Sequence, residues 1–292
     1  MSVRVAACQL AIDVDDPAGT RTRLERAVLA AAEAGARLVV LPELAAAGSC
    51  FASRDEALAV AQPVDGEFVT QLAALSARLG CVLVSGICEA DGDQVYNSAV
   101  VLDQGELRTV YRKVHLWGIE SRLFTPGARP PDVVDTSAGR VAPLICYDLE
   151  FPEWVRRAAD RGAEIIAGPA NWPLLPRPAG ERPLEVTKAQ AFAGTYRVFV
   201  VIADRCGTER GQEWIGGSTV VGADGYPMAG PASDVAGEAS PQLLLADLDL
   251  GLARDKSIGP YNDARRDRRP DLYDLARLET ADHPREHGAR DR

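Results

Sequence analysis

One stretch of sequence decides the fold, Val141-Ala-Pro-Leu-Ile-Cys146-Tyr-Asp-Leu-Glu-Phe-Pro-Glu153. Its apolar start can form a buried strand. Pro152-Glu153 suits the first turn of a helix, because the N–H that proline lacks has no partner there in any case. The carboxylate of Glu153 also lies at the positive end of the helix dipole. Cys146 would then lie at the carboxyl edge of a sheet, beside backbone N–H groups able to stabilise an oxyanion. A buried core cysteine is the commoner interpretation, so a nucleophile needs partners elsewhere in the chain.

The composition indicates a globular enzyme that acts on small molecules. The chain has 292 residues and is 47% hydrophobic, which is ample for a core. Its formal net charge of −10 argues against a nucleic-acid partner or an anionic membrane surface, because both need clustered Lys and Arg. No apolar run approaches the roughly 20 residues of a membrane span, and no signal peptide precedes the strand-like start at Val3. We therefore expect a cytoplasmic protein.

The cysteines do not form the spacing of a metal site or a disulfide framework. They are scattered at Cys8, Cys50, Cys81, Cys88, Cys146 and Cys206. Zinc sites use paired short spacings, and disulfide frameworks belong mainly to secreted proteins. We interpret five of the six as structural thiols and expect neither a metal nor a cofactor.

Strands alternate with helices along both halves of the chain. In the first half the hydrophobic pattern predicts strands over 3–8, 37–41, 81–87, 96–102 and 107–114 and helices over 19–34 and 66–79. The second half repeats this order, with strands over 140–146, 164–168, 198–204, 217–222 and 243–248 and helices over 153–161 and 184–196. Fully apolar strands imply sheets that are covered on both faces. The sequence therefore predicts an α/β sandwich of two sheets with outer helices.

The two halves also share a short segment of similar pattern. Each of the segments 35–42 and 162–169 closes a helix at a glycine and runs through a buried strand to a proline. If the halves are pseudo-equivalent, the ends of their strands bring Glu43 and Cys146 to one cleft. No linker divides the halves, so we expect residues 1–279 to form a single domain and residues 280–292 to form a loosely packed polar tail.

The candidate partners of Cys146 are acids and a lysine. Only one histidine, His115, lies outside the polar tail, so a papain-like dyad would have to use it. Carboxylate-assisted chemistry would instead use Glu43, because a shielded carboxylate has a raised pKa suited to accepting a thiol proton; a solvated loop acid is the other interpretation. Lys113 could stabilise a thiolate and an oxyanion, or be an exposed lysine at a strand edge. Glu120 could pair with that lysine, or be a surface charge.

Together these segments resemble the nitrilase superfamily, the carbon–nitrogen hydrolases with a Glu-Lys-Cys triad. The motifs that carry the resemblance are Leu41-Pro-Glu43, Tyr111-Arg-Lys-Val-His-Leu116, Glu120-Ser-Arg-Leu-Phe-Thr-Pro-Gly127 and Ile145-Cys-Tyr-Asp148. Further matches are Asn171-Trp172, Gly216-Gly-Ser218 and Arg268-Arg-Pro-Asp-Leu-Tyr273. The resemblance implies a four-layer αββα sandwich of two mixed β-sheets flanked by helices. It also implies a homodimer or a higher homo-oligomer.

The resemblance further implies a role for each matching residue. Glu43 is expected to take the Cys146 proton as the sulfur attacks a carbonyl carbon, while Lys113 and the backbone N–H of Tyr147 hold the oxyanion. Glu120 is expected to orient the lysine. Ammonia then leaves, and water activated by the same base hydrolyses the thioester without a metal or a cofactor.

The predicted substrate is a small aliphatic amide, because Cys-Tyr-Asp after the nucleophile is similar to the amidase and carbamoylase branches. Asn171 and Trp172 open a segment that resembles a pocket-side loop, although a core position for the tryptophan is nearly as common. Arg177 would favour a substrate carboxylate, and Glu150 a cationic amine, unless both are ordinary solvated or helix-end charges. The alternatives are an N-carbamoyl amine or amino-acid amidohydrolase, a nitrilase, and a silent accessory domain that delivers ammonia to a partner.

Overall fold

The computed structural model describes residues 2–232 and 239–273. Contacts divide the chain into two units, Met1–Lys256 and Ser257–Arg292. The described part of the second unit holds the short 3-10 helix Pro270–Leu272 (η2) and an isolated β-bridge. The predicted domain limit at residue 279 and the polar tail 280–292 lie outside the described residues, so both stay predictions.

The first sheet of unit Met1–Lys256 is mixed and covered by helices, and it includes one strand from the end of the unit. The strands run in the order β5-β4-β3-β2-β1, and β14 pairs antiparallel with β1. They are β1 (Ser2–Ala11), β2 (Leu38–Val40), β3 (Val82–Asp91), β4 (Gln94–Asp103), β5 (Glu106–Arg112) and β14 (Gln242–Asp249). The helices are α1 (Pro17–Glu33), α2 (Arg54–Val60) and α3 (Glu67–Leu79). Asp16 caps α1 by accepting the N–H of Gly19, and Gly80 ends α3 in the left-handed conformation.

The second sheet is also covered by helices. Its strands run in the order β9-β8-β7-β6, and β12 and β13 extend the sheet beyond β9. They are β6 (Val134–Thr136), β7 (Gly139–Pro143), β8 (Ile165–Ala170), β9 (Phe199–Cys206), β12 (Thr219–Val221) and β13 (Pro227–Ala229). The longer helices are α5 (Pro152–Asp160) and α6 (Leu184–Tyr196). Short elements complete the unit: α4 (Glu120–Leu123), the 3-10 helix η1 (Cys146–Glu150), β10 (Thr208–Glu209), β11 (Gln212–Glu213) and α7 (Gly251–Arg254).

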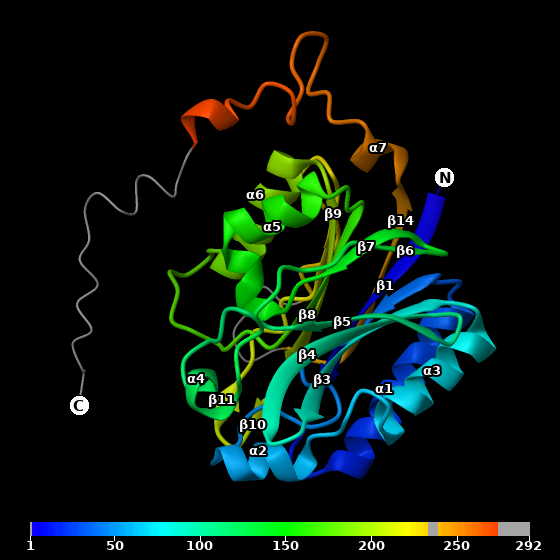
Figure 1. Cartoon of the computed structure of the whole chain (residues 1–292), viewed down its shortest axis with the longest axis vertical. Helices are drawn as coiled ribbons and strands as arrows, with labels where there is room; N and C mark the ends of the chain where they lie inside the picture. The colour runs from blue at the N-terminus through cyan, green and yellow to red at the C-terminus, as the bar shows by residue number, and fades with distance from the viewer. Residues whose placement is uncertain (1, 233–238, 274–292) are drawn as a thin grey trace. The chain divides into compact units, whose positions relative to one another are not determined.

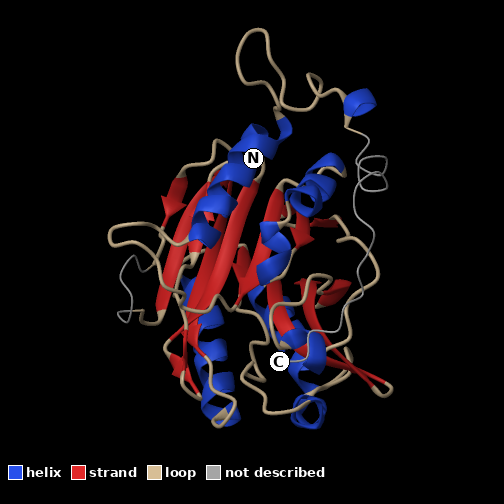
Figure 2. Ribbon diagram, turned by 90° about the vertical axis from the view of Figure 1, so that its left-hand side faces the viewer, coloured by secondary structure: helices blue, strands red, loops and turns tan. Residues whose placement is uncertain are grey.

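Three apolar clusters show the layers. A central cluster joins residues of the two sheets, among them Val84 from β3 and Val201 from β9, so the sheets pack face to face. A second cluster packs α1 and α3 on the first sheet, and a third packs α5 and α6 on the other. In Figure 1 these helix pairs lie on the outer sides of the strands, and Figure 2 shows helices covering the sheets. The predicted α/β architecture is therefore confirmed.

The two sheets are also joined along one edge, which the pattern did not predict. β1 pairs in parallel with β9 through Leu10 with Arg205 and Ala11 with Cys206. The strand order is therefore continuous from β5 to β6. β1 can serve both sheets because it is ten residues long, and its last residues extend past the end of its pairing with β14.

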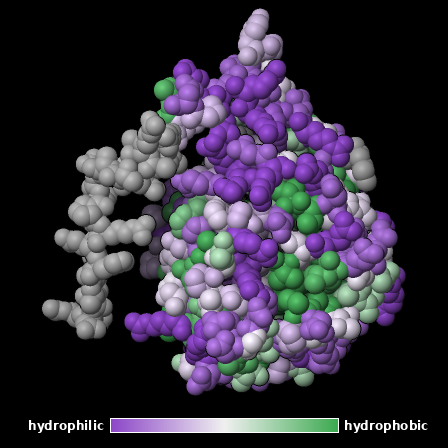
Figure 3. Space-filling model, viewed as in Figure 1, coloured by the Kyte–Doolittle hydropathy of each residue, from purple (hydrophilic) through white to green (hydrophobic). Residues whose placement is uncertain are grey.

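Figure 3 shows a mainly hydrophilic face interrupted by separate apolar patches. Within the described residues, no helix combines the length and the apolar character that a bilayer span requires.

Gly86 in β3 lets the chain around Glu43 approach the sheet. The N–H of Gly86 donates to the carbonyl of Pro42 at 3.1 Å, and its carbonyl accepts the N–H of Ala45 at 3.2 Å. A Cβ at this position would lie 2.4 Å from the backbone nitrogen of Leu44 and 2.5 Å from the Cα of Glu43. Neither neighbour is the end of a flexible side chain, so the backbone itself would have to move.

We expect Gly86→Ala to lower the free energy of unfolding by about 3 kcal/mol, at the upper end of typical overpacking costs, because the clash is with backbone. Urea denaturation followed by circular dichroism measures this change. Gly251→Ala is the matched control, because its added carbon meets nothing nearer than 3.2 Å, and that neighbour is a side-chain atom. Equal stability of the two variants would contradict the interpretation.

Candidate active site

Cys146 occupies a sharp turn between strand β7 and helix α5. The strand ends at Pro143, three residues before the limit predicted from the sequence, although the N–H of Leu144 still reaches the carbonyl of Ala167 at 3.0 Å. Cys146 has a φ of +46°, in the left-handed region that residues other than glycine rarely adopt, and it opens η1. Such strained positions gather at functional sites because the surroundings must hold them there.

The buried carboxylate of Asp148 holds this turn. It accepts the N–H of Ile145 at 3.3 Å and the hydroxyl of Tyr111 at 2.7 Å. It also accepts the backbone N–H of His115 at 3.1 Å and lies 2.7 Å from the Nδ1 of the same residue. Tyr111 and His115 stand two residues before and after Lys113, so one carboxylate links the cysteine turn to the segment that carries the lysine. The histidine considered for a papain-like dyad is thus bound to Asp148.

Lys113 lies between two carboxylates. Its Nζ is 2.7 Å from the Oε1 of Glu43, and 3.0 Å and 2.7 Å from the two carboxylate oxygens of Glu120. The side chains of Glu43 and Lys113 are each 1% exposed, and that of Glu120 is 15% exposed. Two segments distant in the sequence, one with Glu43 and one with Lys113 and Glu120, therefore bring these charges together.

Asn97 is a member of this group that the sequence analysis missed. Its Nδ2 donates to the Oε1 of Glu43 at 2.6 Å and to the Oε1 of Glu120 at 3.1 Å. Its carbonyl accepts the backbone N–H of Lys113 at 2.8 Å. One residue of β4 therefore orients both acids and the lysine backbone. The available signal was an amide in the mostly apolar strand predicted over 96–102, because an amide that such a strand buries requires a polar partner.

Cys146 shares a pocket with the lysine. The pocket has a volume of about 200 Å³ and is lined by Ser49, Cys50, Phe51, Lys113, Trp117, Gly118, Ile119, Glu120, Cys146, Asn171, Pro173, Gln212 and Trp214. The thiol interacts electrostatically with Glu43, Lys113 and Glu120, and a backbone hydrogen bond at Asn171 favours its thiolate form. Cys146, Lys113 and Glu120 therefore line one pocket, and Glu43 lies buried behind it in contact with Lys113.

Burial dominates the acid–base properties of the site. It raises the pKa of the Glu43 carboxyl above its ordinary value, although the Lys113 ammonium opposes this. Burial also raises the pKa of the Cys146 thiol, and the charge of Glu43 adds to the effect. Burial alone would lower the pKa of Lys113, but the carboxylates of Glu120 and Glu43 outweigh it and raise that pKa well above its ordinary value. The resting site holds a neutral thiol beside a lysine cation.

The remaining predicted residues lie at different depths. Asn171 lines the pocket and is 6% exposed. Trp172 is 1% exposed and belongs to the core cluster beneath α5 and α6, which is the core position that the sequence left open. Tyr147 is partly exposed, and its ring packs edge-on against those of Trp117 and Phe151. The structure therefore brings Asn171, but not the Trp172 side chain, to the pocket.

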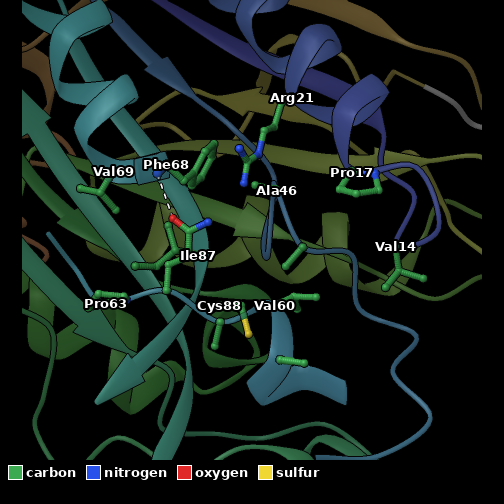
Figure 4. A pocket seen from close by; sticks show the side chains of 14 residues that line it. Val14, Pro17, Arg21, Ala46, Val60, Pro63, Phe68, Val69, Ile87 and Cys88 are labelled. Carbon is green, nitrogen blue, oxygen red and sulfur yellow. Dashed lines mark hydrogen bonds between the residues drawn. The ribbon is translucent and has the colours of Figure 1, made fainter. Parts of the chain in front are cut away.

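A second pocket of about 310 Å³ is not lined by any of the predicted site residues. Figure 4 shows its largely apolar lining, with Val60, Phe68 and Ile87 around the space and Arg21 at one side. The loop after Glu43 contributes Ala46 and Ala47 to this lining. Within residues 2–232 and 239–273, no group of three or more His, Cys, Asp or Glu side chains is placed to hold a metal ion.

Comparison with known proteins gives matches over nearly the whole chain. Residues 4–256 match the family described as Carbon-nitrogen hydrolase. The chain is 37% identical over 277 residues to a protein of Pyrococcus abyssi named Nitrilase, covering 93% of this chain and 99% of that one. It is 31% identical over 285 residues to N-carbamoylputrescine amidase of Solanum lycopersicum, covering 93% of each.

The fold is similar to a solved amidase. The structure of a mutant of the amidase from Nesterenkonia sp. has a TM-score of 0.74 and 28% identity, covering 94% of this chain and 96% of that one. In that structure the acetamide moiety of fluoroacetamide is covalently added at the active site cysteine.

We expect Asn97→Ala to lower kcat about tenfold, which corresponds to roughly 1.4 kcal/mol in the activation barrier, because both glutamates lose a donor that orients them. Steady-state kinetics with a substrate that the enzyme hydrolyses measure this change in kcat. Ser98→Ala is the matched control, since the neighbouring Ser98 donates instead to Glu89. A similar loss of kcat in both variants would show that only the strand had been disturbed.

The pH dependence of kcat/KM should have its acid limb above the ordinary glutamate pKa of 4.5, because Glu43 must be ionised to accept a proton and its pKa is raised. Activity therefore falls as pH falls through that raised value. Lys113 keeps its proton throughout, so it adds no loss of activity between about pH 7 and pH 9. Asn97→Ala should move the acid limb to higher pH, because this hydrogen bond lowers the Glu43 pKa. An acid limb at or below 4.5 would contradict the assignment of the base.

Proposed function

Because this chain belongs to the carbon–nitrogen hydrolase family of the nitrilase superfamily, we propose that it hydrolyses small aliphatic amides to a carboxylate and ammonia. The observation that carries the proposal is the buried contact of Lys113 with Glu43 and Glu120 at the pocket of Cys146. Catalysis through a cysteine needs a base for the thiol proton and a fixed charge for the oxyanion. These residues supply both.

In the first step the Sγ of Cys146 attacks the amide carbon, and the thiol proton passes to Glu43. The Oε1 of Glu43 is occupied by Lys113 and Asn97, whereas its Oε2 is buried and has no hydrogen-bond partner among the described residues. Oε2 is therefore the oxygen that accepts the proton. The carbonyl oxygen gains the negative charge, which the Lys113 ammonium and the N–H of Tyr147 stabilise.

In the second step the C–N bond breaks. The nitrogen takes the proton from Glu43 and leaves as ammonia, and the acyl group remains on Cys146 as a thioester. Glu43, ionised again, removes a proton from a water molecule that attacks the thioester carbon. The C–S bond then breaks, the sulfur recovers a proton from Glu43, and the carboxylic acid gives its proton to the solvent and leaves as the carboxylate.

The pocket lining supports an uncharged acyl group. Beyond Lys113 and Glu120, its side chains are apolar, aromatic or neutral polar. Neither charge considered for substrate recognition lines it: Glu150 pairs with Lys188, and the Nε of Arg177 donates to the carbonyl of Glu181 at 3.1 Å. The similarity to N-carbamoylputrescine amidase and to a protein named Nitrilase makes an N-carbamoyl amine and a nitrile the two further candidates.

Purified protein incubated with aliphatic amides, N-carbamoyl amines and nitriles tests the proposal. We expect ammonia from the amides without carbon dioxide; ammonia together with carbon dioxide would identify a carbamoyl substrate. Cys146→Ala should abolish the release of ammonia. Cys81→Ala is the control, because this buried cysteine lies in the outer cluster beneath α1 and α3. Full activity of Cys146→Ala would refute the proposal.

A further inference from the structure

Two segments that carry no residue of the proposed chemistry form much of the Cys146 pocket. Ser49, Cys50 and Phe51 come from the loop that follows Glu43, and Gln212 and Trp214 come from the hairpin that follows β9. Loops hold their shape only when their backbone groups find partners. The partner of both segments is a buried ion pair.

Arg205 and Glu209 form this pair, with both side chains 0% exposed. The Nη2 of Arg205 lies 3.0 Å from Oε1 of Glu209, and its Nη1 lies 3.2 Å from Oε2. A buried ion pair is stable only if further hydrogen bonds satisfy its remaining atoms. Some of the further bonds go to the segment after β1, where Nη2 of Arg205 donates to the carbonyl of Ile12 and Oε1 of Glu209 accepts the N–H of Val14 at 2.9 Å. The others go to the pocket loop.

The carboxylate of Glu209 binds that loop directly. Its Oε2 accepts the backbone N–H groups of Ser49 and Cys50 at 2.9 Å and 2.8 Å. Nη1 of Arg205 also donates to the hydroxyl of Ser49 at 3.2 Å. Gly48 permits the approach, because it has a φ of +77° and a Cβ there would lie 2.5 Å from the Glu209 carboxylate.

The guanidinium of Arg205 supports the second segment. It lies over the ring of Trp214, 4.5 Å from the ring centroid. The Trp214 ring is 7% exposed and lines the pocket. Stacking of a desolvated guanidinium on an indole is both attractive and directional. Glu209 therefore binds the loop, and Arg205 contacts both the loop and the ring of Trp214.

The carboxylate of Glu209 stays ionised in this position. Burial would raise its pKa, but the charge of Arg205 and the N–H groups of the loop outweigh burial and lower the pKa. The contacts on the loop are thus charge-assisted hydrogen bonds, which are roughly twice as strong as neutral ones.

We propose that the Arg205–Glu209 pair is the positioning element that sets the size of the acyl group this enzyme accepts. The inference rests on the proposed amidase function, since the acyl group is the part of the substrate that fills the pocket. Neither residue lines the pocket, so both act through the walls they hold. Loosening the pair should therefore weaken binding of small amides and admit larger ones.

The test compares wild type with Glu209→Gln, which keeps the shape but loses the charge and one acceptor oxygen. We expect KM for propionamide to rise about tenfold with kcat within about threefold, and the ratio of kcat/KM for hexanamide to that for propionamide to rise at least about tenfold. Glu164→Gln is the matched control, because Glu164 is also buried and paired, with Arg254. The proposal would be overturned if the hexanamide-to-propionamide ratio of kcat/KM in Glu209→Gln stayed within about twofold of wild type, or if the ratio changed equally in Glu164→Gln.

Arg205→Lys is the second variant, used also if Glu209→Gln does not fold. A lysine keeps the charge but loses the second N–H contact and the stacking on Trp214, so a smaller change of at least about threefold in the same ratio is expected. An unchanged ratio in this variant would overturn the proposal. Thermal unfolding of each variant identifies loss of the fold.

Alkylation of Cys146 separates this inference from the proposed function. If wild type hydrolyses no amide, the function fails, but the rates at which iodoacetamide and the bulkier N-ethylmaleimide modify Cys146 still report the pocket. Peptide mass spectrometry assigns the modified residue. Glu209→Gln should raise the relative rate of the bulkier reagent at least about fivefold, and an unchanged relative rate would overturn the positioning role.

Discussion

The structure depends on one buried ammonium held between two carboxylates. Lys113 and Glu43 are almost completely removed from water, and Glu120 closes the group. Two carboxylates and one ammonium carry a net negative charge, which is costly to bury unless the geometry is tight and the remaining oxygens are bonded. Asn97 and the backbone N–H of Trp117, 2.7 Å from Glu120, supply such bonds to three of the four oxygens, and Oε2 of Glu43 is left without one in the described part of the chain.

The fold holds Lys113 and the two glutamates in a fixed arrangement. Glu43 follows a strand of the first sheet, Lys113 follows another, and Cys146 follows a strand of the second sheet. The face-to-face packing of the sheets brings the three together, and the Asp148 carboxylate joins the cysteine turn to the segment around the lysine. Sites built on strand ends are more rigid than sites built on free loops. The strained φ of Cys146 is stable because these contacts hold it.

The same burial shapes the chemistry. A carboxylate with a raised pKa is a better base for a thiol at neutral pH, and a lysine whose pKa is raised by two acids stays a cation. In the proposed mechanism, proton transfer and oxyanion stabilisation are divided between Glu43 and Lys113. In the proposed function, recognition of the acyl group rests on shape, because the pocket lining is neutral apart from Lys113 and Glu120. The loops that give this shape contact a second buried ion pair, Arg205 with Glu209.

The sequence by itself determined the order of the longer strands and most helices, because hydrophobic periodicity is local, but it did not predict the short elements α2, β6 and β13. It indicated Glu43, Lys113, Glu120 and Cys146 because each stands in a recognisable motif. Only the tertiary structure decided that Asn97 joins the two glutamates, that the Trp172 side chain lies in the core, and that β1 links both sheets. These features depend on which strands face each other and on how side chains share buried space. Contacts between residues far apart in the chain leave no periodic trace in the sequence, so folding alone determines them.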